Sequence, residues 1–213
     1  MNKENLKTVA VIVAHPDDET LWTGGTMLSH SEWNVFIVSL CRASDTNRAP
    51  RFFQALKVIG AEGKMGDLDD SPDQKPLDEK EVEQAILDIL PARKYDLIIT
   101  HDPRGEYTRH LRHEEIGKAV IKLWNAGKIA ASELWSFAYE DGGRKYYPRP
   151  IERANIVRLL TLPIWQRKYS LMTETYGFDK SSWEAQTTPS SESFWQFTNS
   201  EDAMHWLNKQ TVL

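Results

Sequence analysis

The sequence predicts an α/β fold in which a mostly parallel sheet lies between two layers of helices, as a three-layer sandwich. Short apolar runs alternate with helix-like segments over about residues 6–140, and such alternation is typical of parallel sheets with right-handed crossovers. The first run, Thr8–Ala14, is apolar and rich in β-branched residues, as a central strand buried on both faces requires. From Gly142 onward the alternation loosens. We therefore expect one domain over residues 1–213, with an irregular, helical C-terminal extension at about 141–213.

Each expected strand is a short apolar run bounded by polar or turn residues. The strands predicted in this way are Thr8–Ala14, Asn34–Cys41, Tyr95–Thr100 and Glu133–Tyr139. The expected helices carry apolar residues at helical spacing, as in Leu77–Leu90, where Val82, Ile86 and Ile89 form one stripe and Pro91 follows. The other predicted helices are Thr20–Ser31, Pro50–Ile59, Arg109–Ala126, Ile151–Leu162, Ile164–Tyr176 and Asp202–Lys209.

Some segments depart from these patterns. Gly24 and Gly25 lie inside the first predicted helix, where they weaken its helical propensity but let it approach the sheet closely. Residues 67–73 form an acidic loop, and residues 179–200 are rich in Ser, Thr and Asp with interspersed aromatic residues. Both segments are expected to be irregular.

The overall composition is that of an ordinary soluble protein, with a formal net charge of -5 and 27% charged residues. The acidic balance argues against nucleic acid as a partner, because such an interface usually needs a basic face. Cys41 is the only cysteine, which excludes an internal disulfide and predicts a buried, inert thiol. No apolar run approaches the roughly 20 residues of a membrane span, and the polar N-terminal residues leave no room for a signal peptide. A cytoplasmic location is expected.

The most informative segment is His15-Pro16-Asp17-Asp18-Glu19, which directly follows the first predicted strand. In open α/β sheets, ligands bind beyond the carboxyl ends of the strands. One imidazole and three carboxylates at such a position cannot all stay desolvated and unpaired. A divalent metal ion would compensate their charge.

A second pair of candidate ligands, His110 and His113, follows the strand that ends at Thr100. These histidines are three residues apart at the start of a predicted helix, as His15 and Asp18 are, so the members of each pair can face one point. Parallel strands end at the same edge of a sheet, and the two pairs can therefore meet. Three protein ligands and one open position are typical of catalytic zinc. His15, Asp18 and His113 would supply two imidazoles and one carboxylate.

The residues that remain at this edge suggest hydrolysis. Bound zinc lowers the pKa of its water to about 7. Asp17 can take the proton of that water and pass it to a leaving amine, and an imidazolium at His110 can stabilise the oxyanion. Taken alone, each motif has an ordinary explanation, as solvated histidines or as acidic residues such as Glu19 near a helix N-terminus. Their conjunction after two apolar strands favours the metal site.

The chain resembles a known family in these segments. Ala14–Glu19 reads Ala-His-Pro-Asp-Asp-Glu, the signature of the PIG-L/LmbE-like N-acetylglucosaminyl deacetylases, and Gly105–His113 resembles that family's His-Pro-Asp-His motif. The resemblance covers about residues 6–140. It implies a Rossmann-like fold and zinc-dependent hydrolysis of the acetamide of an N-acetylated amino sugar. By position it implies the metal ligands His15, Asp18 and His113, the general base Asp17, and His110 as the residue that stabilises the tetrahedral intermediate.

The resemblance also suggests two substrate-binding residues. Arg48 falls where the family often places a substrate-binding arginine, and Asp69 falls in a loop where a sugar-hydroxyl acceptor is similar in position. Arg48 could equally be a solvated charge near a helix N-terminus, and Asp67 and Asp70 compete with Asp69 for its role.

One departure from the family pattern concerns the tuning of His110. Leu111-Arg112 stands where the family has Pro-Asp, and an arginine cannot hold the neighbouring imidazole protonated. Either another carboxylate, Glu114 or Glu106, replaces that aspartate, or Arg112 faces solvent and His110 acts by hydrogen bonding alone.

The substrate pocket is expected to be built by the loops around 67–77 and 139–150 and by the C-terminal part. Trp22, which follows the first motif, and the tryptophans of the C-terminal part could stack on sugars, although most tryptophans serve packing. The aromatic residues of 165–206 would suit a subunit interface as readily as a lid, so a homo-oligomer stays open. The candidate tryptophans are Trp22, Trp165, Trp183, Trp195 and Trp206.

Several functions compete with deacetylation of a small N-acetylated sugar. An amidase on the same scaffold could cleave a bulkier acyl group or a thiol-sugar conjugate. Iron or cobalt could replace zinc in a site with nitrogen and oxygen ligands. A non-catalytic module could bind metal or sugar, although it would have no use for an unligated Asp17. A nucleotide-binding protein is disfavoured, because no Gly-x-Gly-x-x-Gly follows the first strand.

Overall fold

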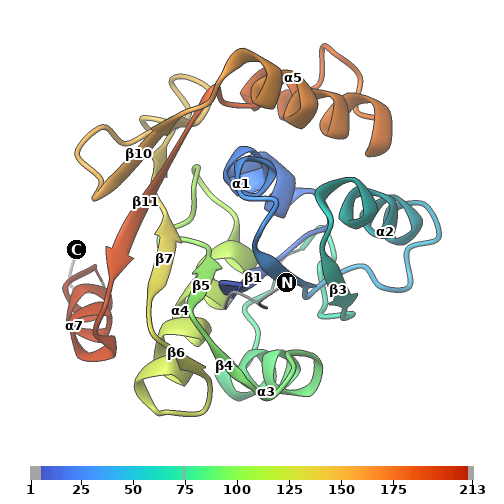
Figure 1. Cartoon of the computed structure of the whole chain (residues 1–213). Coiled ribbons are helices and arrows are strands. Elements are labelled where there is room, and N and C mark those ends of the chain that lie inside the picture. Colours follow the sequence, from blue (N-terminus) through green and yellow to red (C-terminus); the bar gives the residue numbers. More distant parts are fainter. Residues whose placement is uncertain (1–5, 74, 211–213) are drawn as a thin grey trace, which may run out of the picture.

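A central sheet carries the most apolar segments of the chain. The computed structural model describes residues 6–73 and 75–210, and within them seven strands form this sheet in the order β10-β11-β7-β5-β1-β2-β3 (Figure 1). Strand pairs from β7 to β3 are parallel, whereas β11 is antiparallel to β7 and to β10. The mostly parallel sheet is therefore confirmed. The strands are β1 (Thr8–Val13), β2 (Asn34–Ser39), β3 (Glu62–Met65), β5 (Leu97–Thr100), β7 (Leu134–Phe137), β10 (Ile156–Leu159) and β11 (Ser191–Phe197).

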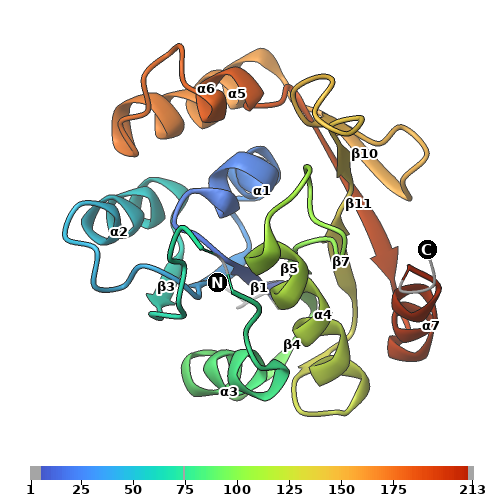
Figure 2. The ribbon, with the colours of Figure 1, turned by 180° about the vertical axis from the view of Figure 1, so that it is seen from behind.

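Helices cover both faces of the sheet, as the three-layer prediction requires. Buried apolar residues of α1, α2 and the π-helical turn η1 pack on one face, and those of α3, α4 and α7 pack on the other. Figure 2 shows the same layers from behind, with α5 and α6 above α1. The helical segments are α1 (Asp18–Ser29), α2 (Arg48–Ile59), α3 (Glu79–Ile89), α4 (Leu111–Asn125), α5 (Leu162–Ser170), η1 (Leu171–Thr175), α6 (Trp183–Thr187) and α7 (Ser200–Gln210).

Strand β1 occupies the centre of the sheet and explains where a site can form. Its side chains alternate between the two cores, with Val9 and Val11 on one face and Ala10 and Ile12 on the other, all fully buried. The chain proceeds from β1 to β2 and β3 on one side, and later to β5 and β7 on the other. The carboxyl end of β1 therefore lies at the point where the strand order reverses, which is the usual ligand position in open α/β sheets.

The C-terminal part differs from the prediction. The helix predicted over Ile151–Leu162 is wrong, because β10 forms there as an edge strand with Leu159 83% exposed. Strand β11 was not predicted, because its sequence begins with Ser and Glu residues rather than an apolar run. Strand β3 was missed for a similar reason: Glu62-Gly63-Lys64-Met65 lies at the other edge and is only partly buried.

A buried ion pair explains how a polar strand fits the sheet. Glu192 of β11 and Lys168 of α5 are both fully buried and lie 2.7 Å apart. The Glu192 carboxylate also accepts hydrogen bonds from the backbone N–H groups of Gly25 (2.8 Å) and Thr26 (2.7 Å). A Cβ atom at Gly25 would collide with the Leu160 side chain. The close approach that the glycines predicted is therefore confirmed, and it ties the C-terminal part to α1.

The structure also confirms the buried thiol and adds four short strands outside the main sheet. Cys41 is fully buried, as predicted. Among the described helices, none has both the length and the apolar character needed to cross a membrane. The short strands pair as β4 (Lys94–Tyr95) with β6 (Ala130–Ala131), and as β8 (Tyr139–Glu140) with β9 (Arg149–Pro150).

Candidate metal centre and active site

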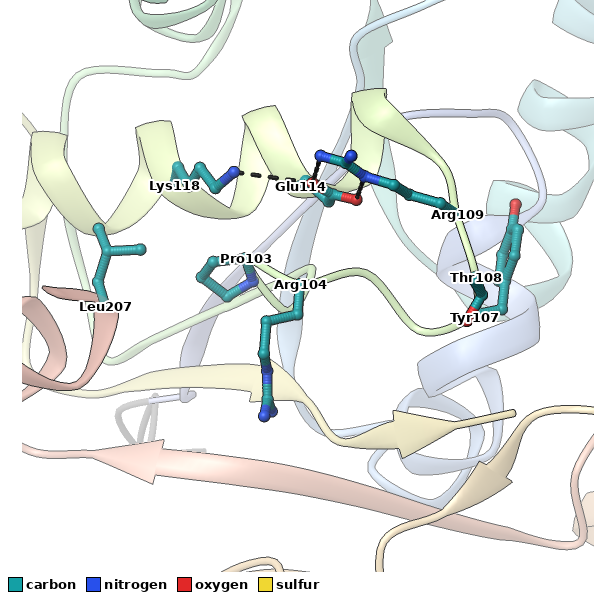
Figure 3. Close-up of a pocket in the computed structure, with 8 residues that line it drawn as sticks. All are labelled: Pro103, Arg104, Tyr107, Thr108, Arg109, Glu114, Lys118 and Leu207. Atoms are coloured by element: carbon teal, nitrogen blue, oxygen red, sulfur yellow. Dashed lines mark hydrogen bonds and ion pairs between the residues drawn. The ribbon is translucent and has the colours of Figure 1, made fainter. Parts of the chain in front are cut away.

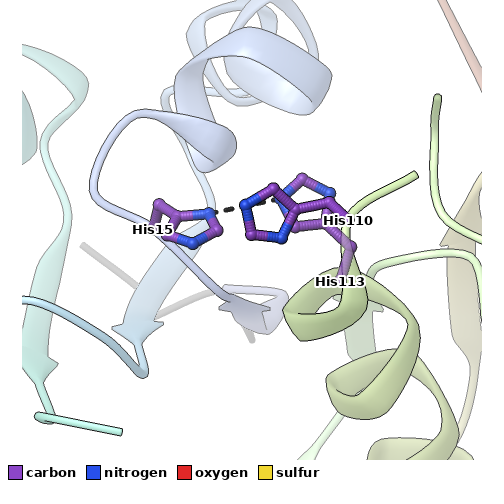
Figure 4. A group of neighbouring side chains, drawn as sticks. All are labelled: His15, His110 and His113. Carbon is purple, nitrogen blue, oxygen red and sulfur yellow. Dashed lines mark hydrogen bonds between the residues drawn. The ribbon is translucent and has the colours of Figure 1, made fainter. Parts of the chain in front are cut away.

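Two chain segments converge at the carboxyl ends of β1 and β5. The turn after β1 places His15 there, and α1 begins at Asp18. The loop after β5 returns to the same edge, where His110 precedes α4 and His113 lies in its first turn. Figure 4 shows the rings of His15, His110 and His113 gathered at one point, although they come from distant parts of the sequence. The predicted meeting of the two motifs occurs in the structure.

The three predicted metal ligands form a compact triangle. The Nδ1 atom of His15 lies 3.0 Å from Oδ2 of Asp18 and 3.2 Å from Nε2 of His113. The third side, from Nε2 of His113 to Oδ2 of Asp18, measures 3.3 Å. Tetrahedral zinc with ligand bonds of about 2.0–2.2 Å separates its ligand atoms by roughly 3.3–3.6 Å, slightly more than the sides of this triangle. The triangle therefore fits a small divalent cation.

Carboxylates behind the two histidines orient their rings. Nδ1 of His113 lies 2.6 Å from Oε2 of Glu106, and Nε2 of His15 lies 3.2 Å from Oδ1 of Asp70. A proton held on each of these outer nitrogens leaves the inner nitrogen with its lone pair. The three atoms of the triangle are then all acceptors at close range. Lone pairs gathered at this range favour a cation among them.

His101 is a buried histidine that the sequence prediction left out. Its Nε2 accepts a hydrogen bond from the Ala14 N–H (2.9 Å), and its Nδ1 lies 3.0 Å from Glu106 Oε2. Its ring stacks on the His113 ring with centroids 4.0 Å apart. Asp18, His101 and His113 bring ligand atoms close enough for a metal ion. Because Nε2 of His101 is already engaged, we assign His101 to support rather than to ligation.

The buried charges are set by these contacts. Burial alone would raise the pKa of Asp18, but the surrounding imidazoles lower it well below its usual range. Burial likewise opposes ionisation of Glu106, yet His101 and His113 lower the pKa of its carboxyl to about 2. Both carboxylates are thus ionised at neutral pH, which favours a bound cation.

Asp17 lies beside the triangle without joining it. Its Oδ2 accepts a hydrogen bond from Arg48 at 2.9 Å. The residue is the N-cap of α1 and has a φ of 133°, a strained conformation for a non-glycine residue. Burial and the neighbouring Asp18 charge raise the pKa of Asp17 well above its usual range, against the effect of Arg48. A carboxylate with a raised pKa is suited to accept a proton.

Glu19 supports this strained turn. It is fully buried, and its Oε2 accepts a hydrogen bond from the Asp17 N–H at 3.0 Å. Its other oxygen accepts hydrogen bonds from the hydroxyls of Thr20 (2.5 Å) and Tyr176 (2.6 Å). Glu19 is therefore more than a solvated acidic residue at a helix N-terminus, and it connects the turn to the C-terminal part.

His110 faces the triangle from the second motif. Its ring centroid lies 4.5 Å from that of His15 and 4.6 Å from that of His113. Burial and the charges of those two histidines lower the pKa of His110 to about 3. This shift favours the neutral ring, and the imidazolium that the sequence suggested stays a prediction. A neutral imidazole can still donate one N–H hydrogen bond.

The burial of Arg112 decides one of the two alternatives raised for it. The suggestion that Arg112 faces solvent is wrong, because its side chain is fully buried. It donates hydrogen bonds to the carbonyls of Asp69 and Lys75 and thereby holds the acidic loop. Of the candidate carboxylates, Glu106 contacts His101 and His113 as described above. Glu114 pairs instead with Arg109 and Lys118.

A cavity of about 200 Å³ opens over the candidate metal centre. Arg48 lines it, and so does Trp183, one of the candidate sugar-stacking tryptophans. Tyr107, which the sequence did not assign to the site, also lines it. Asp70 also lines it and is joined to Arg42 at 2.5 Å. The Asp69 side chain is 53% exposed and lies outside this lining. The substrate-binding roles of Arg48 and Asp69 stay predictions.

A signal for the supporting residues was present in the sequence. His101 directly follows the apolar strand β5, just as His15 follows β1 after one residue. Polar residues at the carboxyl end of every buried parallel strand are candidates by the same argument. Asp70 and Trp183 had no such signal, because loops and the C-terminal part bring them to the site.

Replacement of Glu106 by glutamine is expected to weaken metal binding by about 10-fold to 100-fold, because Glu106 orients the ligand His113. Competition with a coloured chelator measures the metal affinity. Glu114→Gln is the matched control, since Glu114 contacts Arg109 and Lys118 and should bind metal as the unmodified protein does. Equal affinities in the two variants would rule out this role of Glu106.

A family model described as PIG-L: GlcNAc-PI de-N-acetylase matches residues 10–124. An uncharacterized protein of Acanthamoeba polyphaga mimivirus is 22% identical over 144 residues. That match spans 61% of this chain and 61% of the length of the viral protein.

Solved structures share the fold at low sequence identity. N,N'-diacetylchitobiose deacetylase from Pyrococcus horikoshii has a TM-score of 0.68 at 16% identity, covering 91% of this chain and 85% of that one. A 4-carboxy-2-hydroxymuconate hydratase from Pseudomonas putida has a TM-score of 0.61 at 14% identity, covering 90% and 96%. The zinc-inhibited form of a teicoplanin deacetylase has a TM-score of 0.52 at 14% identity, covering 80% and 84%.

Proposed function

Because the chain belongs to the PIG-L (GlcNAc-PI de-N-acetylase) family, we propose that it hydrolyses the acetamide of an N-acetylated amino sugar or sugar conjugate with the help of a divalent metal ion. The observation that carries the proposal is the triangle of His15, Asp18 and His113, whose three facing atoms fit a cation. A cytoplasmic location and an N-acetylated sugar as partner belong to the same proposal.

His15, Asp18 and His113 would hold the ion, which is zinc in the simplest assignment. A bound divalent ion supplies Lewis acidity, which makes a water molecule nucleophilic at neutral pH. Mixed nitrogen and oxygen ligands also accept iron or cobalt. The related teicoplanin deacetylase has been solved in a zinc-inhibited form, so all three metals belong in the test.

Asp17 would act as the general base. It accepts the proton of the attacking water as the oxygen bonds to the acetamide carbon, and it returns the proton to the nitrogen when the C–N bond breaks. The products are acetate and the free amine. Arg48 holds the Asp17 carboxylate at 2.9 Å and so fixes the direction from which it approaches the water.

His110 would stabilise the oxyanion that forms at the carbonyl. Its ring borders the same cavity as Asp17, and one N–H of a neutral imidazole is sufficient for a directed hydrogen bond. In this proposal Arg48 and Asp69 also contact the sugar, Arg48 from the cavity wall and Asp69 from the adjacent loop.

Removal of the metal by a strong chelator is expected to abolish deacetylation, and one equivalent of zinc, iron(II) or cobalt(II) is expected to restore it. The measurement is amine release from a panel of N-acetylated sugars of different sizes, joined to metal analysis of the same samples. The 4-carboxy-2-hydroxymuconate hydratase shares this fold but catalyses a different reaction. The release of amine must therefore be measured directly. A metal-loaded protein that releases amine from no member of the panel would contradict the proposal.

A further inference from the structure

We propose that a short segment of the C-terminal part, residues 176–178, positions Asp17 for proton transfer. The inference rests on the proposed role of Asp17 as general base, and it adds Tyr176 and Phe178 as positioning residues. This segment, the clamp, directly follows η1 and lies outside residues 10–124, the part that the family model matches. Its two aromatic side chains reach Asp17 through two different neighbours of that residue.

Tyr176 supports the backbone of Asp17 through Glu19. The Tyr176 hydroxyl donates a hydrogen bond at 2.6 Å to one oxygen of the fully buried Glu19 carboxylate, and the other oxygen accepts the Asp17 N–H at 3.0 Å. A buried carboxylate is costly unless hydrogen-bond donors surround it. Tyr176 therefore helps keep Glu19 in place, and Glu19 holds Asp17 in its strained conformation with a φ of 133°.

Phe178 supports the side chain of Asp17 through Arg48. The Arg48 guanidinium lies over the Phe178 ring, 4.6 Å from its centroid, and donates a hydrogen bond to Oδ2 of Asp17 at 2.9 Å. A guanidinium stacked on a ring loses much of the freedom of its long side chain. The ring therefore sets the direction from which Arg48 meets the carboxylate.

The clamp is itself fixed to α2 and η1. Arg51 of α2 donates a hydrogen bond to the Tyr176 carbonyl, and the Phe178 N–H donates one to the Met172 carbonyl of η1 at 3.1 Å. Gly177 lies between the two aromatic residues with a φ of 73°, and a Cβ atom there would collide with the Arg51 guanidinium. This left-handed glycine lets the two neighbouring rings face different partners.

The metal ligand next to Asp17 has other supports. The Asp18 carboxylate accepts hydrogen bonds from the His15 N–H at 2.8 Å and from the indole N–H of Trp22 at 3.1 Å. Trp22 is fully buried and belongs to the core that α1 forms with the sheet. Changes in the clamp should therefore leave the metal affinity near normal.

The second motif is also fixed by contacts of its own. Figure 3 shows Arg109, which precedes α4, paired with Glu114, and Glu114 also meets Lys118. These residues line a separate cavity of about 360 Å³ beside α4. Loss of the clamp should thus disturb Asp17 while His110 keeps its place.

Tyr176→Phe removes the hydroxyl and keeps the ring. On the metal-loaded full chain, kcat for amine release is expected to fall by about 10-fold to 100-fold, the range for loss of a hydrogen bond to a charged group. KM and metal affinity should stay near those of the unmodified protein. Phe178→Leu, which removes the ring beneath Arg48, should lower kcat by roughly 2-fold to 10-fold. Tyr95→Phe is the matched control and should leave kcat unchanged, because the Tyr95 hydroxyl donates to the Pro91 carbonyl (2.9 Å) and its ring packs in the core on the other face of the sheet.

A double variant distinguishes positioning of the base from general loosening of the protein. With Asp17→Asn in place, the side chain that the clamp positions can no longer accept a proton. Adding Tyr176→Phe should then lower kcat by less than about 2-fold. A loss of about 10-fold or more in this background would overturn the role of the clamp, as would loss of the metal from folded Tyr176→Phe.

A second measurement follows the Asp17 amide and needs no turnover. Its hydrogen exchange, measured by NMR on the full chain, should be at least about 10-fold faster in Tyr176→Phe, because the Glu19 carboxylate that accepts the Asp17 N–H has lost a donor. The amide of Val11 in β1 is the internal reference and should not change. An unchanged Asp17 amide would overturn the inference, whatever the activity. Faster exchange in a protein that releases no amine would support the clamp and contradict the proposed deacetylation instead.

Discussion

Replacement of His113 by alanine is expected to abolish both metal binding and deacetylation. His113 supplies one of the three atoms of the triangle and links it to Glu106 through the 2.6 Å contact at Nδ1. Its removal leaves two ligands for the ion and takes from the fully buried Glu106 carboxylate one of its two imidazole contacts. Metal content after dialysis and the rate of amine release measure the two effects.

The control for this variant is His205→Ala, because His205 is exposed on α7, a helix outside the site. It should keep full metal content and activity. Circular dichroism distinguishes loss of the ligand from loss of the fold. If folded His113→Ala retains stoichiometric metal, His113 is not a ligand.

Asp17→Asn is expected to bind metal nearly normally while its activity falls by about 100-fold or more, the usual contribution of a general base. The amide keeps the shape of the side chain and a hydrogen-bond acceptor for Arg48, but it cannot take a proton at neutral pH. Metal content and kcat are measured on the same preparation of the variant and compared with those of the unmodified protein. Asp88→Asn, on the exposed side of α3, should change neither quantity.

The same variant distinguishes Asp17 as the general base from Asp17 as a metal ligand. An Asp17→Asn protein that loses its metal would show that Asp17 is a ligand and that the roles of Asp17 and Asp18 are exchanged. An active, metal-loaded variant would show that another group accepts the proton.

The sheet core and the convergence of the candidate metal ligands could be predicted because local sequence carries their signals. A short, β-branched apolar run such as Thr8–Ala14 is typical of a buried strand, and the carboxyl ends of parallel strands meet at one edge. His15, Asp18 and His113 then lie together as a consequence of topology. The sequence near each strand end was sufficient to find them.

The C-terminal strands could not be predicted, because their stability depends on distant partners. Glu192 is buried in β11 only because Lys168 and two backbone N–H groups of α1 satisfy its carboxylate. Without knowledge of that pairing, a polar segment is indistinguishable from a loop. Edge strands such as β3 and β10 are hard to predict from the sequence for the same reason, because one side of each is solvated.

The positions of residues in the outer part of the site could not be predicted from the sequence, for a related reason. Arg112 reads as a surface charge in sequence, yet the carbonyls of Asp69 and Lys75 allow it to be fully buried. By holding that loop it helps bring Asp70 against His15. Trp183 reaches the cavity from a five-residue helix, α6. Neither placement follows from periodicity.

A crystal structure of the zinc-loaded protein with anomalous data at the metal edge tests the central claim most directly. We expect one ion bonded to Nδ1 of His15, a carboxylate oxygen of Asp18 and Nε2 of His113 at about 2.0–2.2 Å, with Asp17 unbonded and facing the open position. An ion held elsewhere, or a His113 ring turned away from His15 and Asp18, would contradict the account.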